Sequence, residues 1–403
     1  MKRRKFLEAS GVISTSMFLP GFISKCATKE DAVKSSSSRS GNILIVIQLS
    51  GGNDGLNTFI PYQDDLYYKA RPEIAIRANR VLKVDDRLGF HPSIASIRSL
   101  YDSGEMTIIN NVGYPNPNRS HFLSIDIWHS ASPEGGSNRN SGWIGRYLDS
   151  NCSGCDKPYH AIEIEDTMSL VMRGKQNQGF AISNTKLLEY FKNYDTNILE
   201  SNNPSTQSEN DDLSFLYKVA SDSEMSADFI HSKLKPRITT SNYPDTAFGK
   251  KLNMVADLVM SDLPTKIYYV TLSGFDTHNS QPNRHKKMLQ NYADSVAALI
   301  DDLKKNNLFD ESLILTFSEF GRRVSQNASR GTDHGKANNM MLMGGKLKTP
   351  GFVNGFPDLQ DLLDGDLKYT MDFRRVYADV FKNWLKTDAQ NILNKRFDPI
   401  NLV

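Results

Sequence analysis

The sequence predicts a three-layer α/β fold with a central, mostly parallel sheet flanked by helices. Its candidate strands are continuous apolar runs, and segments with helical spacing lie between them. Continuous apolar strands are expected where helices cover both faces of a parallel sheet. In addition, acids and histidines stand directly after several of these strands. Because ligands bind at the carboxyl ends of the strands in open α/β sheets, these residues predict one polar site.

The first 25 residues predict a twin-arginine export signal. Lys2-Arg3-Arg4-Lys5-Phe6-Leu7 carries the paired arginines, and the apolar stretch from Gly11 to Ile23 is too short to span a bilayer of about 30 Å. The alternative is a basic leader without this function. We expect the twin-arginine translocase as a partner and a periplasmic or cell-envelope location.

Residues 26–41 form a serine-rich linker after the signal. Cys26 occupies the position of a lipidated cysteine in bacterial lipoproteins, and lipidation there predicts a membrane tether. Lys25 departs from the small residue that usually precedes such a cysteine. Simple removal of the leader is therefore the alternative.

Residues 42–403 are long enough for one large α/β domain. The chain has 48 basic and 46 acidic residues and no concentrated basic stripe, which argues against nucleic acid as a partner. Cys152 and Cys155 favour a local disulfide, since a zinc site needs a second pair and a redox motif needs a thioredoxin-like setting. The polar segment Asp195–Asp212 is typical of an exposed loop.

The predicted strands and helices follow from apolar runs and from helical spacing. The strands are expected at Asn42–Leu49, Met106–Val112, His160–Glu165, Lys266–Leu272, Leu313–Phe317 and Met340–Met343. The helices are expected at Pro92–Tyr101, Phe122–Ala131, Ser214–Lys233, Ala247–Ser261, Arg284–Lys305 and Asp372–Leu385.

The glycine-rich turn after the first strand presents one candidate metal ligand. Asp54 follows Gly51-Gly52-Asn53 and can be aimed at a cation, with Asn53 beside it and Asn57 less directly placed. The alternative is that Asp54 caps the next helix or closes the turn. The glycines do not follow the Gly-x-Gly-x-x-Gly pattern, which argues against a dinucleotide site.

Further candidate ligands follow the later strands. Asp276 and His278 are two residues apart in an extended segment, so their side chains point the same way and can hold one ion. Glu319, Asp333 and His334 occupy other strand ends or the loops after them, which favours a divalent-metal site over scattered residues. The remaining histidines lie inside or beside predicted elements and are interpreted as structural, with His91 left open: His129, His160, His231 and His285.

Ser120 is the candidate nucleophile. It precedes a predicted helix, where free backbone N–H groups and the helix dipole favour an anion, and Arg119 or His121 can add positive charge. A serine at this position is alternatively a simple N-cap. Beside a metal cluster, however, it suits an attacking oxygen in phosphoryl or sulfuryl transfer. Arg322, like Arg119, can neutralise a bound oxyanion or pair with a nearby acid.

Taken in order, the motifs resemble a large uncharacterised family of twin-arginine-exported bacterial proteins. This domain of unknown function is grouped with the alkaline phosphatase and sulfatase superfamily. The resemblance extends from about residue 42 to the end, and the motifs after the leader are Gly-Gly-Asn-Asp-Gly-Leu-Asn, Asn-Arg-Ser-His-Phe, Gly-Phe-Asp-Thr-His, Phe-Ser-Glu-Phe-Gly-Arg and Thr-Asp-His-Gly.

The resemblance implies an alkaline phosphatase-like fold with one or two divalent ions at the strand ends. It implies Ser120 as the nucleophile, with the metal ligands Asp54, Asp276, His278, Glu319 and His334 and an assisting role for Asp333. Two features depart from the superfamily. Glu319-Phe320 stands where an adjacent Asp-His is usual, so one imidazole ligand is missing and the two-metal count is in doubt. No Cys-x-Pro-x-Arg signature surrounds Ser120, so formylglycine is not indicated.

Together these observations predict an exported, metal-dependent hydrolase of phosphate or sulfate esters, acting on a small-molecule or glycan ester. The metal is expected to be Zn, Mg, Mn or Ca. The alternative is a non-catalytic envelope or glycan-binding protein that keeps the fold with a degraded metal site. Metal content separates the two, because a hydrolase of this kind is inert without its ion.

Overall fold

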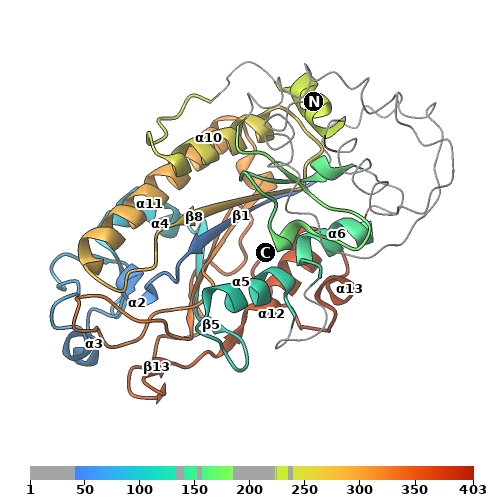
Figure 1. Cartoon of the computed structure of the whole chain (residues 1–403). Helices are drawn as coiled ribbons and strands as arrows, with labels where there is room; N and C mark the ends of the chain where they lie inside the picture. Colours follow the sequence, from blue (N-terminus) through green and yellow to red (C-terminus); the bar gives the residue numbers. More distant parts are fainter. Residues whose placement is uncertain (1–40, 133–139, 152–156, 185–222, 224, 235–238) are drawn as a thin grey trace, which may run out of the picture.

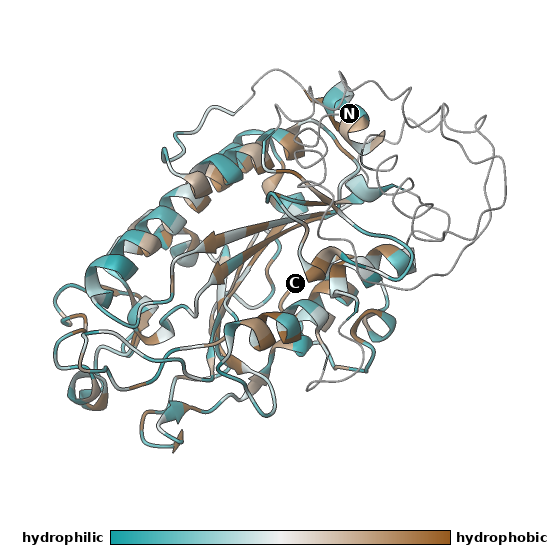
Figure 2. Ribbon diagram, viewed as in Figure 1, coloured by the Kyte–Doolittle hydropathy of each residue, from teal (hydrophilic) through white to brown (hydrophobic). Residues whose placement is uncertain are grey.

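The computed structural model describes residues 41–132, 140–151, 157–184, 223, 225–234 and 239–403 (Figure 1). Within these residues, nine strands form one central sheet, and helices cover both of its faces. The chain therefore has the three-layer α/β architecture that its sequence predicts. Figure 2 shows the central strands as predominantly hydrophobic, in keeping with a sheet buried between helices.

The sheet has the order β11, β5, β10, β9, β1, β8, β6, β7, with β14 also paired to β5. Its strands are β1 (Ile43–Ser50), β5 (Met106–Gly113), β6 (Ala161–Glu163), β7 (Phe180–Ala181), β8 (Ile267–Ser273), β9 (Ser312–Phe317), β10 (Asn338–Met343), β11 (Gly351–Val353) and β14 (Met371–Asp372). The central β1 is parallel to both β8 and β9, whereas β10 is antiparallel to β5 and β9. The sheet is thus mostly parallel, as predicted.

Strand β1 separates two hydrophobic cores because its successive side chains point to opposite faces. Ile43, Ile45 and Ile47 belong to one core, and Leu44 and Val46 belong to the other. The first core is covered by the 3₁₀ helix Pro92–Ile97, α4 (Arg98–Asp102), α10 (Ala247–Met260) and α11 (Gln281–Lys305). The second is covered by α5 (His121–Ser130), α6 (Trp143–Asn151), α12 (Phe373–Asp379) and α13 (Ala389–Leu393).

The six predicted strands are present, and most bounds differ by one or two residues. Two predicted helices are each divided. The pattern Pro92–Tyr101 begins as a 3₁₀ helix because Ile94 has non-helical dihedral angles, and the pattern Asp372–Leu385 continues from α12 into a π-helical turn, Val380–Trp384. Of the predicted helix Ser214–Lys233, residues 225–233 are helical and most of the remainder lies outside the described residues.

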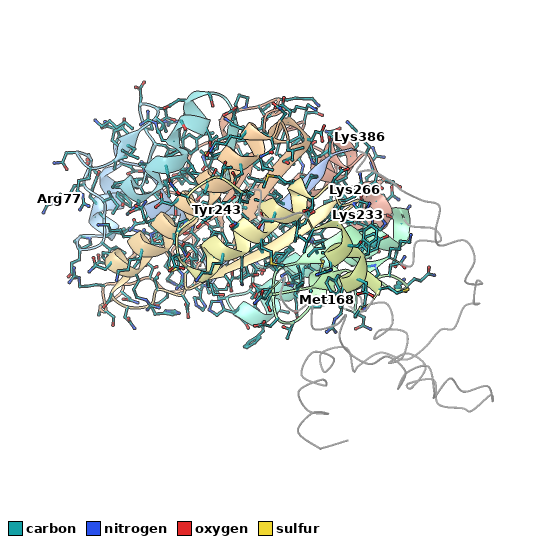
Figure 3. All side chains as sticks on the ribbon, turned by 90° about the horizontal axis from the view of Figure 1, so that it is seen from above. Arg77, Met168, Lys233, Tyr243, Lys266 and Lys386 are labelled. Carbon is teal, nitrogen blue, oxygen red and sulfur yellow. The ribbon has the colours of Figure 1, made fainter. Side chains whose placement is uncertain are left out.

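Several smaller elements surround the carboxyl edge of the sheet. They are α2 (Gly55–Thr58), α3 (Asp65–Ala70), the three-stranded sheet of β2 (Phe59–Ile60), β3 (Leu82–Lys83) and β4 (Gly89–Phe90), and the pair β12 (Leu362–Leu363) and β13 (Asp366–Leu367). Figure 3 shows the long dimension of the molecule, with Arg77, which follows α3, far from Lys266, which precedes β8.

Some predictions fall outside the described residues and stay predictions. They concern the export signal, the linker with Cys26, the pair Cys152 and Cys155, and the loop Asp195–Asp212. Among the residues that are described, none of the helices has both the length and the apolar character needed to cross a membrane.

Candidate metal centre

Four segments that are distant in sequence meet at the carboxyl edge of the sheet. The loops after β1, β8 and β9 lie side by side because these strands are adjacent and parallel. Strand β10 runs antiparallel to β9 and β5, so the loop after β9 leads directly into β10 at this edge and the loop that leaves β5 reaches the same edge. Gly51 allows the close approach, since its φ is +117° and a Cβ there would lie 2.3 Å from the backbone nitrogen of Asp276.

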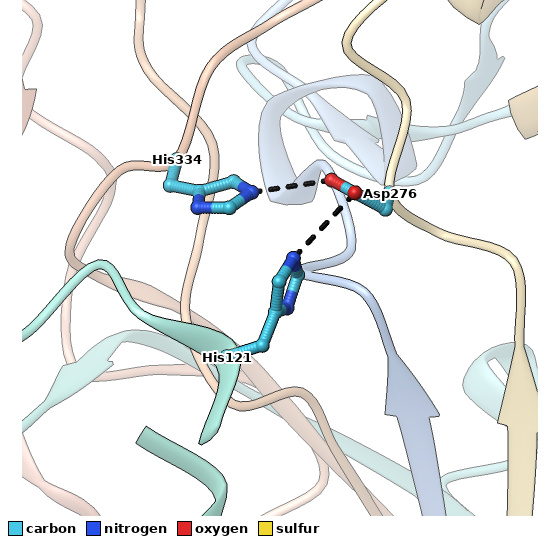
Figure 4. Close-up of side chains that lie close together, drawn as sticks. All are labelled: His121, Asp276 and His334. Carbon is cyan, nitrogen blue, oxygen red and sulfur yellow. Dashed lines mark hydrogen bonds and ion pairs between the residues drawn. The ribbon is translucent and has the colours of Figure 1, made fainter. Parts of the chain in front are cut away.

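Three side chains from these segments form a compact group of possible metal ligands (Figure 4). His121 comes from the start of α5, Asp276 from the loop after β8, and His334 from the loop before β10. One ligand atom of each residue lies within 4.8 Å of those of the other two. His334 Nε2 is 3.1 Å from Asp276 Oδ1, and His121 Nε2 is 3.6 Å from Asp276 Oδ2.

His278 extends this group. Its Nε2 lies 3.1 Å from Asp276 Oδ1 and 2.9 Å from His334 Nε2. The structure thus brings Asp276 and His278 together, as their spacing in an extended segment suggests. Asp333 and His334 contact opposite nitrogens of the His278 ring, because Asp333 Oδ1 lies 3.0 Å from His278 Nδ1 and His334 lies at Nε2.

The hydrogen bonds at the other ring nitrogens determine the tautomers of the three histidines. His334 Nδ1 is 2.7 Å from the carbonyl oxygen of Arg119, which can only accept, so this nitrogen carries the proton. His278 Nδ1 and His121 Nδ1 donate in the same way to the carboxylates of Asp333 and Glu319, at 3.0 and 2.9 Å. In each neutral ring, Nε2 is then left with a lone pair that faces Asp276.

This donor set fits a divalent cation. Three imidazole lone pairs and a carboxylate converge here. When all the rings are neutral, none of these four groups can donate a hydrogen bond to another, so a cation is the partner that suits them all. Two ligand atoms at right angles around a cation with bonds of about 2.1 Å lie about 3 Å apart, which matches the spacing here. Histidines whose second nitrogen donates to a carboxylate or carbonyl are also typical of metal centres, where that bond fixes the ring.

The pKa shifts at the cluster have distinct causes. Partial burial raises the pKa of Asp276, but the hydrogen bond from Arg322 and the contact with His334 outweigh it and bring the value to about 2. The hydrogen bond to Glu319 raises the pKa of His121 above 6.5, whereas burial lowers that of His334. Asp276 is therefore ionised at neutral pH, and acid protonates His121 before His334.

Arg322 contacts Asp276 of the cluster and joins the surrounding loops. Its side chain is fully buried, and its guanidinium donates to the carbonyl oxygens of Gly51, Gly52, Phe275 and Thr332 and to Asp276 Oδ1, the last at 2.7 Å. These contacts hold the loops after β1, β8 and β9 together. They occupy the donors that oxyanion neutralisation would need, so the structure places Arg322 with the acid Asp276.

Asp54 is engaged apart from the cluster. It is buried, and its Oδ2 accepts from Arg71 Nη1 at 2.7 Å and from the Gln281 amide, while its Oδ1 accepts from the backbone of Asn57 at 3.3 Å. Burial raises the pKa of Asp54, but the positive charges of Arg71 and His285 outweigh it and the net shift is downward. Asp54 thus has the capping role that its sequence context left open.

The two asparagines of this turn are also enclosed by protein. Asn53 Oδ1 lies 2.9 Å from His285 Nε2, and its backbone N–H donates to Ser318 Oγ at 2.8 Å. Asn57 Oδ1 accepts from Arg71 and Tyr67. Both asparagines therefore belong to the buried polar group around Asp54, Arg71 and Gln281, which we call the buried floor of the site.

Glu319 holds and orients its neighbours. Its side chain is fully buried, and Oε1 accepts from the backbone of Gly51 at 2.8 Å as well as from His121. The following residue, Phe320, packs its ring against His121 and His334, with centroids 4.9 and 4.5 Å away. A phenyl ring thus packs against both imidazoles.

Ser120 stands next to the cluster at the N-cap of α5. Its side chain makes no capping hydrogen bond, its own backbone N–H donates to Asn118 Oδ1 at 2.7 Å, and the residue is exposed. Both of its neighbours contact the cluster, Arg119 through its carbonyl oxygen and His121 through its ring. The side chain of Arg119 reaches instead to Asp366.

The other histidines lie away from the cluster. His91 Nδ1 accepts from the backbone of Ser93, and His160 Nδ1 bonds the carbonyl of Pro264. His129 is buried against Gln48 and Tyr269.

The sequence analysis did not single out Arg71 and Gln281, although both contact the buried acid Asp54. Neither residue is part of a local motif that would mark it as a partner of that acid.

Comparison with solved structures finds chains of low identity. The PsFucS1 sulfatase from Pseudoalteromonas sp. is 12% identical with a TM-score of 0.41, over 90% of this chain and 71% of that chain. A protein in the alkaline phosphatase superfamily from Vibrio parahaemolyticus is 10% identical with a TM-score of 0.37, over 83% and 69%. The C-terminal periplasmic domain of EcEptC from Escherichia coli, in complex with Zn, is 13% identical with a TM-score of 0.35, over 78% and 75%.

Comparison with curated proteins finds no match. A family model does match, over residues 42–364, which is most of the chain. This chain therefore belongs to the family described as protein of unknown function, DUF1501.

Proposed function

We propose that this protein is an exported, metal-dependent hydrolase of phosphate or sulfate esters in which Ser120 is the nucleophile. One observation carries the proposal. The lone pairs of three oriented histidines converge on Asp276, directly beside an exposed serine whose hydroxyl makes no capping bond.

The residues that would hold the ion are His121, Asp276, His278 and His334. Asp333, Glu319 and the carbonyl of Arg119 keep the three rings in the ligating tautomer. A bound divalent cation supplies positive charge that favours the ionised serine and offsets the negative charge of the ester oxygens. Asp54 is left outside this set because its oxygens are taken by Arg71, Gln281 and Asn57.

Ser120 and helix α5 supply the reacting end of the site. Ser120 Oγ would bond to phosphorus or sulfur as the bond to the leaving-group oxygen breaks, and water would then release the acid from the serine. The first backbone N–H groups of α5 have no acceptor within the helix and favour an anion at this end. The neighbours of Ser120 tie this end of the helix to the metal ligands, His121 as a ligand itself and Arg119 through its carbonyl oxygen on His334.

The test combines metal content with turnover. The mature protein, purified without chelators, is assayed on aryl phosphate, phosphodiester and aryl sulfate substrates, alongside Ser120→Ala, Asp276→Ala/His278→Ala and the control Ser99→Ala on the exposed side of α4. We expect stoichiometric metal in the wild type and in both serine variants, its loss in the double variant, and turnover only in the wild type and Ser99→Ala. A folded wild type without metal or turnover would sink the proposal.

A non-catalytic glycan-binding or envelope protein is the second candidate, and one observation favours it. Asp54 is consumed by a buried ion pair, which leaves a smaller ligand set than the superfamily resemblance implies. Glycan binding by a wild type that holds no metal would support this candidate.

Export is part of the proposal and rests on the N-terminal sequence. Replacing Arg3 and Arg4 by lysine is expected to leave the full-length precursor inside the cell, which fractionation and immunoblotting would detect. Palmitate labelling of the wild type and of Cys26→Ser tests the membrane tether in the same cells.

A further inference from the structure

A second cluster of charged side chains lies beside the candidate metal centre. Arg119 Nη2 pairs with Asp366 Oδ2, and Arg323 Nε lies 3.8 Å from Asp366 Oδ1. Lys336 Nζ donates to Asp364 Oδ2 at 2.8 Å. Asp364 and Asp366 belong to the β12–β13 hairpin, so this hairpin gathers three cations, which we call the cationic shelf.

The shelf carries an excess of positive charge that is fixed in place. Its three cations, Arg119, Arg323 and Lys336, face two carboxylates, which leaves a formal charge of 3 − 2 = +1. The Asp366 side chain is fully buried, whereas those of Arg119 and Arg323 are 37% and 36% exposed. A buried acid thus anchors two guanidinium groups that still reach solvent.

The shelf also has hydrogen-bonding capacity that the described residues do not use. Arg119 Nε and Asp366 Oδ1 are buried, and neither makes a hydrogen bond within this part of the chain. A buried polar atom without a partner is costly, and of these two atoms Arg119 Nε is the donor that an oxygen of an anion can complete. The negative shift in the pKa of Asp364, caused mainly by Lys336 and less by Arg119 and Arg323, agrees with three cations around one hairpin.

Each cation of the shelf is joined to the metal centre by a very short stretch of chain. Arg119 precedes Ser120, Arg323 follows Arg322, and Lys336 lies two residues after His334. Two residues span at most about 7 Å. Hydrogen bonds from Arg323 N to the Asp333 carbonyl and between Arg119 O and His334 fix the two clusters relative to each other.

We propose that the cationic shelf binds a second anionic group of the substrate, one that is not the ester being cleaved. The inference rests on the proposed function and narrows its substrate class to esters whose alcohol portion carries its own carboxylate, sulfate or phosphate. Guanidinium groups suit this role because they bind planar carboxylates and tetrahedral oxyanions through two parallel hydrogen bonds.

The shelf is distinct from the place where the reacting group would bind. The contacts of the Arg119 side chain lie with Asp366, while its main-chain carbonyl faces His334. Arg322 and Arg323 are adjacent, but the first holds Asp276 and the second holds Asp366. The separation of these contacts places the two anions of one substrate at neighbouring positions.

The test measures binding and turnover separately on the mature full chain. Binding of 3-hydroxybenzoate, which represents the anionic alcohol portion, is measured by calorimetry with metal-loaded and chelator-treated protein. Turnover is compared between phenyl phosphate and 3-carboxyphenyl phosphate, and between the two corresponding sulfates. The variants are Arg323→Gln and Lys336→Gln, and the matched control is Arg396→Gln, whose side chain is 82% exposed in a pair with Asp398.

We expect Arg323→Gln to weaken 3-hydroxybenzoate binding about tenfold, since a charge-assisted hydrogen bond contributes about that factor. We also expect the wild type to prefer the carboxylated esters and Arg323→Gln to lose the preference. Equal binding by wild type and Arg323→Gln, or no binding by either, overturns the inference. Arg323-dependent binding without turnover of any ester overturns the proposed function and leaves the anion site standing.

Discussion

Two clusters of charge at the same sheet edge are organised in opposite ways. In the buried floor, Asp54 is enclosed and paired with Arg71, whose side chain is fully buried. In the metal centre above it, Asp276 is 47% exposed and three imidazole nitrogens face it without protons to donate. Both acids follow strands of the same sheet and pair with a buried arginine, but Asp54 is enclosed whereas Asp276 also faces solvent and the imidazoles. Each acid is paired with a fully buried arginine, Arg71 or Arg322, so the comparison indicates that the exposure of the acid, and not the presence of a buried cation, separates the two.

The largest expected effect on stability concerns the buried floor. Arg71→Met leaves Asp54 buried without its cation, and removing one partner of such a pair costs about 3–5 kcal/mol. Denaturant unfolding of the metal-free protein measures the change. The control Arg396→Met removes an exposed pair and is expected to cost less than about 1 kcal/mol. Equal losses of unfolding free energy in Arg71→Met and Arg396→Met would contradict the structural role of the buried pair.

The metal centre is expected to respond in the opposite manner. Asp276→Ala removes the group around which the three rings converge, so we expect metal affinity to fall by more than about 100-fold, beyond the effect of losing an orienting partner. The loss of unfolding free energy should be smaller than in Arg71→Met, because Arg322 keeps its four carbonyl acceptors. Metal analysis and denaturant unfolding of the same preparation check both statements. Retained stoichiometric metal would contradict the assignment.

The partners of the histidines sharpen the comparison further. Asp333→Ala removes the acceptor of His278 Nδ1 and frees the ring to rotate or change tautomer, so metal affinity is expected to fall about 10–100-fold. Competition with a chromogenic chelator measures this affinity. Asp361→Ala, which removes an exposed partner of Lys368, is the matched control. If both variants bind metal as the wild type does, Asp333 does not orient a ligand.

Much of the fold follows from the sequence because its signals are local. The continuous apolar runs at Ile43–Ser50 and Ser312–Phe317 identify buried parallel strands, and the strand-end position of Asp276 identifies one edge as polar. The antiparallel direction of β10 is not encoded in its own residues, yet it brings His334 to that edge.

The division of roles among the acids depends on contacts between distant residues. Asp54 and Asp276 have similar local settings, and Arg71, which pairs with Asp54, lies 17 residues after it in a segment without a recognisable motif. Arg322 likewise meets Asp276 only after three strands have assembled. The tautomers of the histidines depend on a carbonyl and two carboxylates from other loops, so no spacing rule predicts them.

The smallest expected effect is the pH dependence of His121. The hydrogen bond that His121 donates to Glu319 raises the pKa of His121 above 6.5, so the folded, metal-free protein holds this proton more tightly than the unfolded chain does. The resulting stability is fully present below pH 6.5 and is lost as pH rises through the folded-state pKa. Metal binding has the opposite dependence, because a protonated Nε2 has no lone pair for the ion. As the pH is lowered, we expect the metal affinity to begin to fall while the pH is still above 6.5.

Glu319→Gln tests this origin while keeping an acceptor for His121 and for the backbone of Gly51. We expect it to lower the pKa of His121 and to move the loss of metal affinity toward lower pH. Nuclear magnetic resonance of the His121 ring and metal titrations between about pH 5.5 and 8.5 measure the two quantities. Because burial dominates at His334 and lowers its pKa, that ring should titrate below His121 in both proteins. Identical profiles for wild type and Glu319→Gln would show that the carboxylate neither charges nor orients the ring.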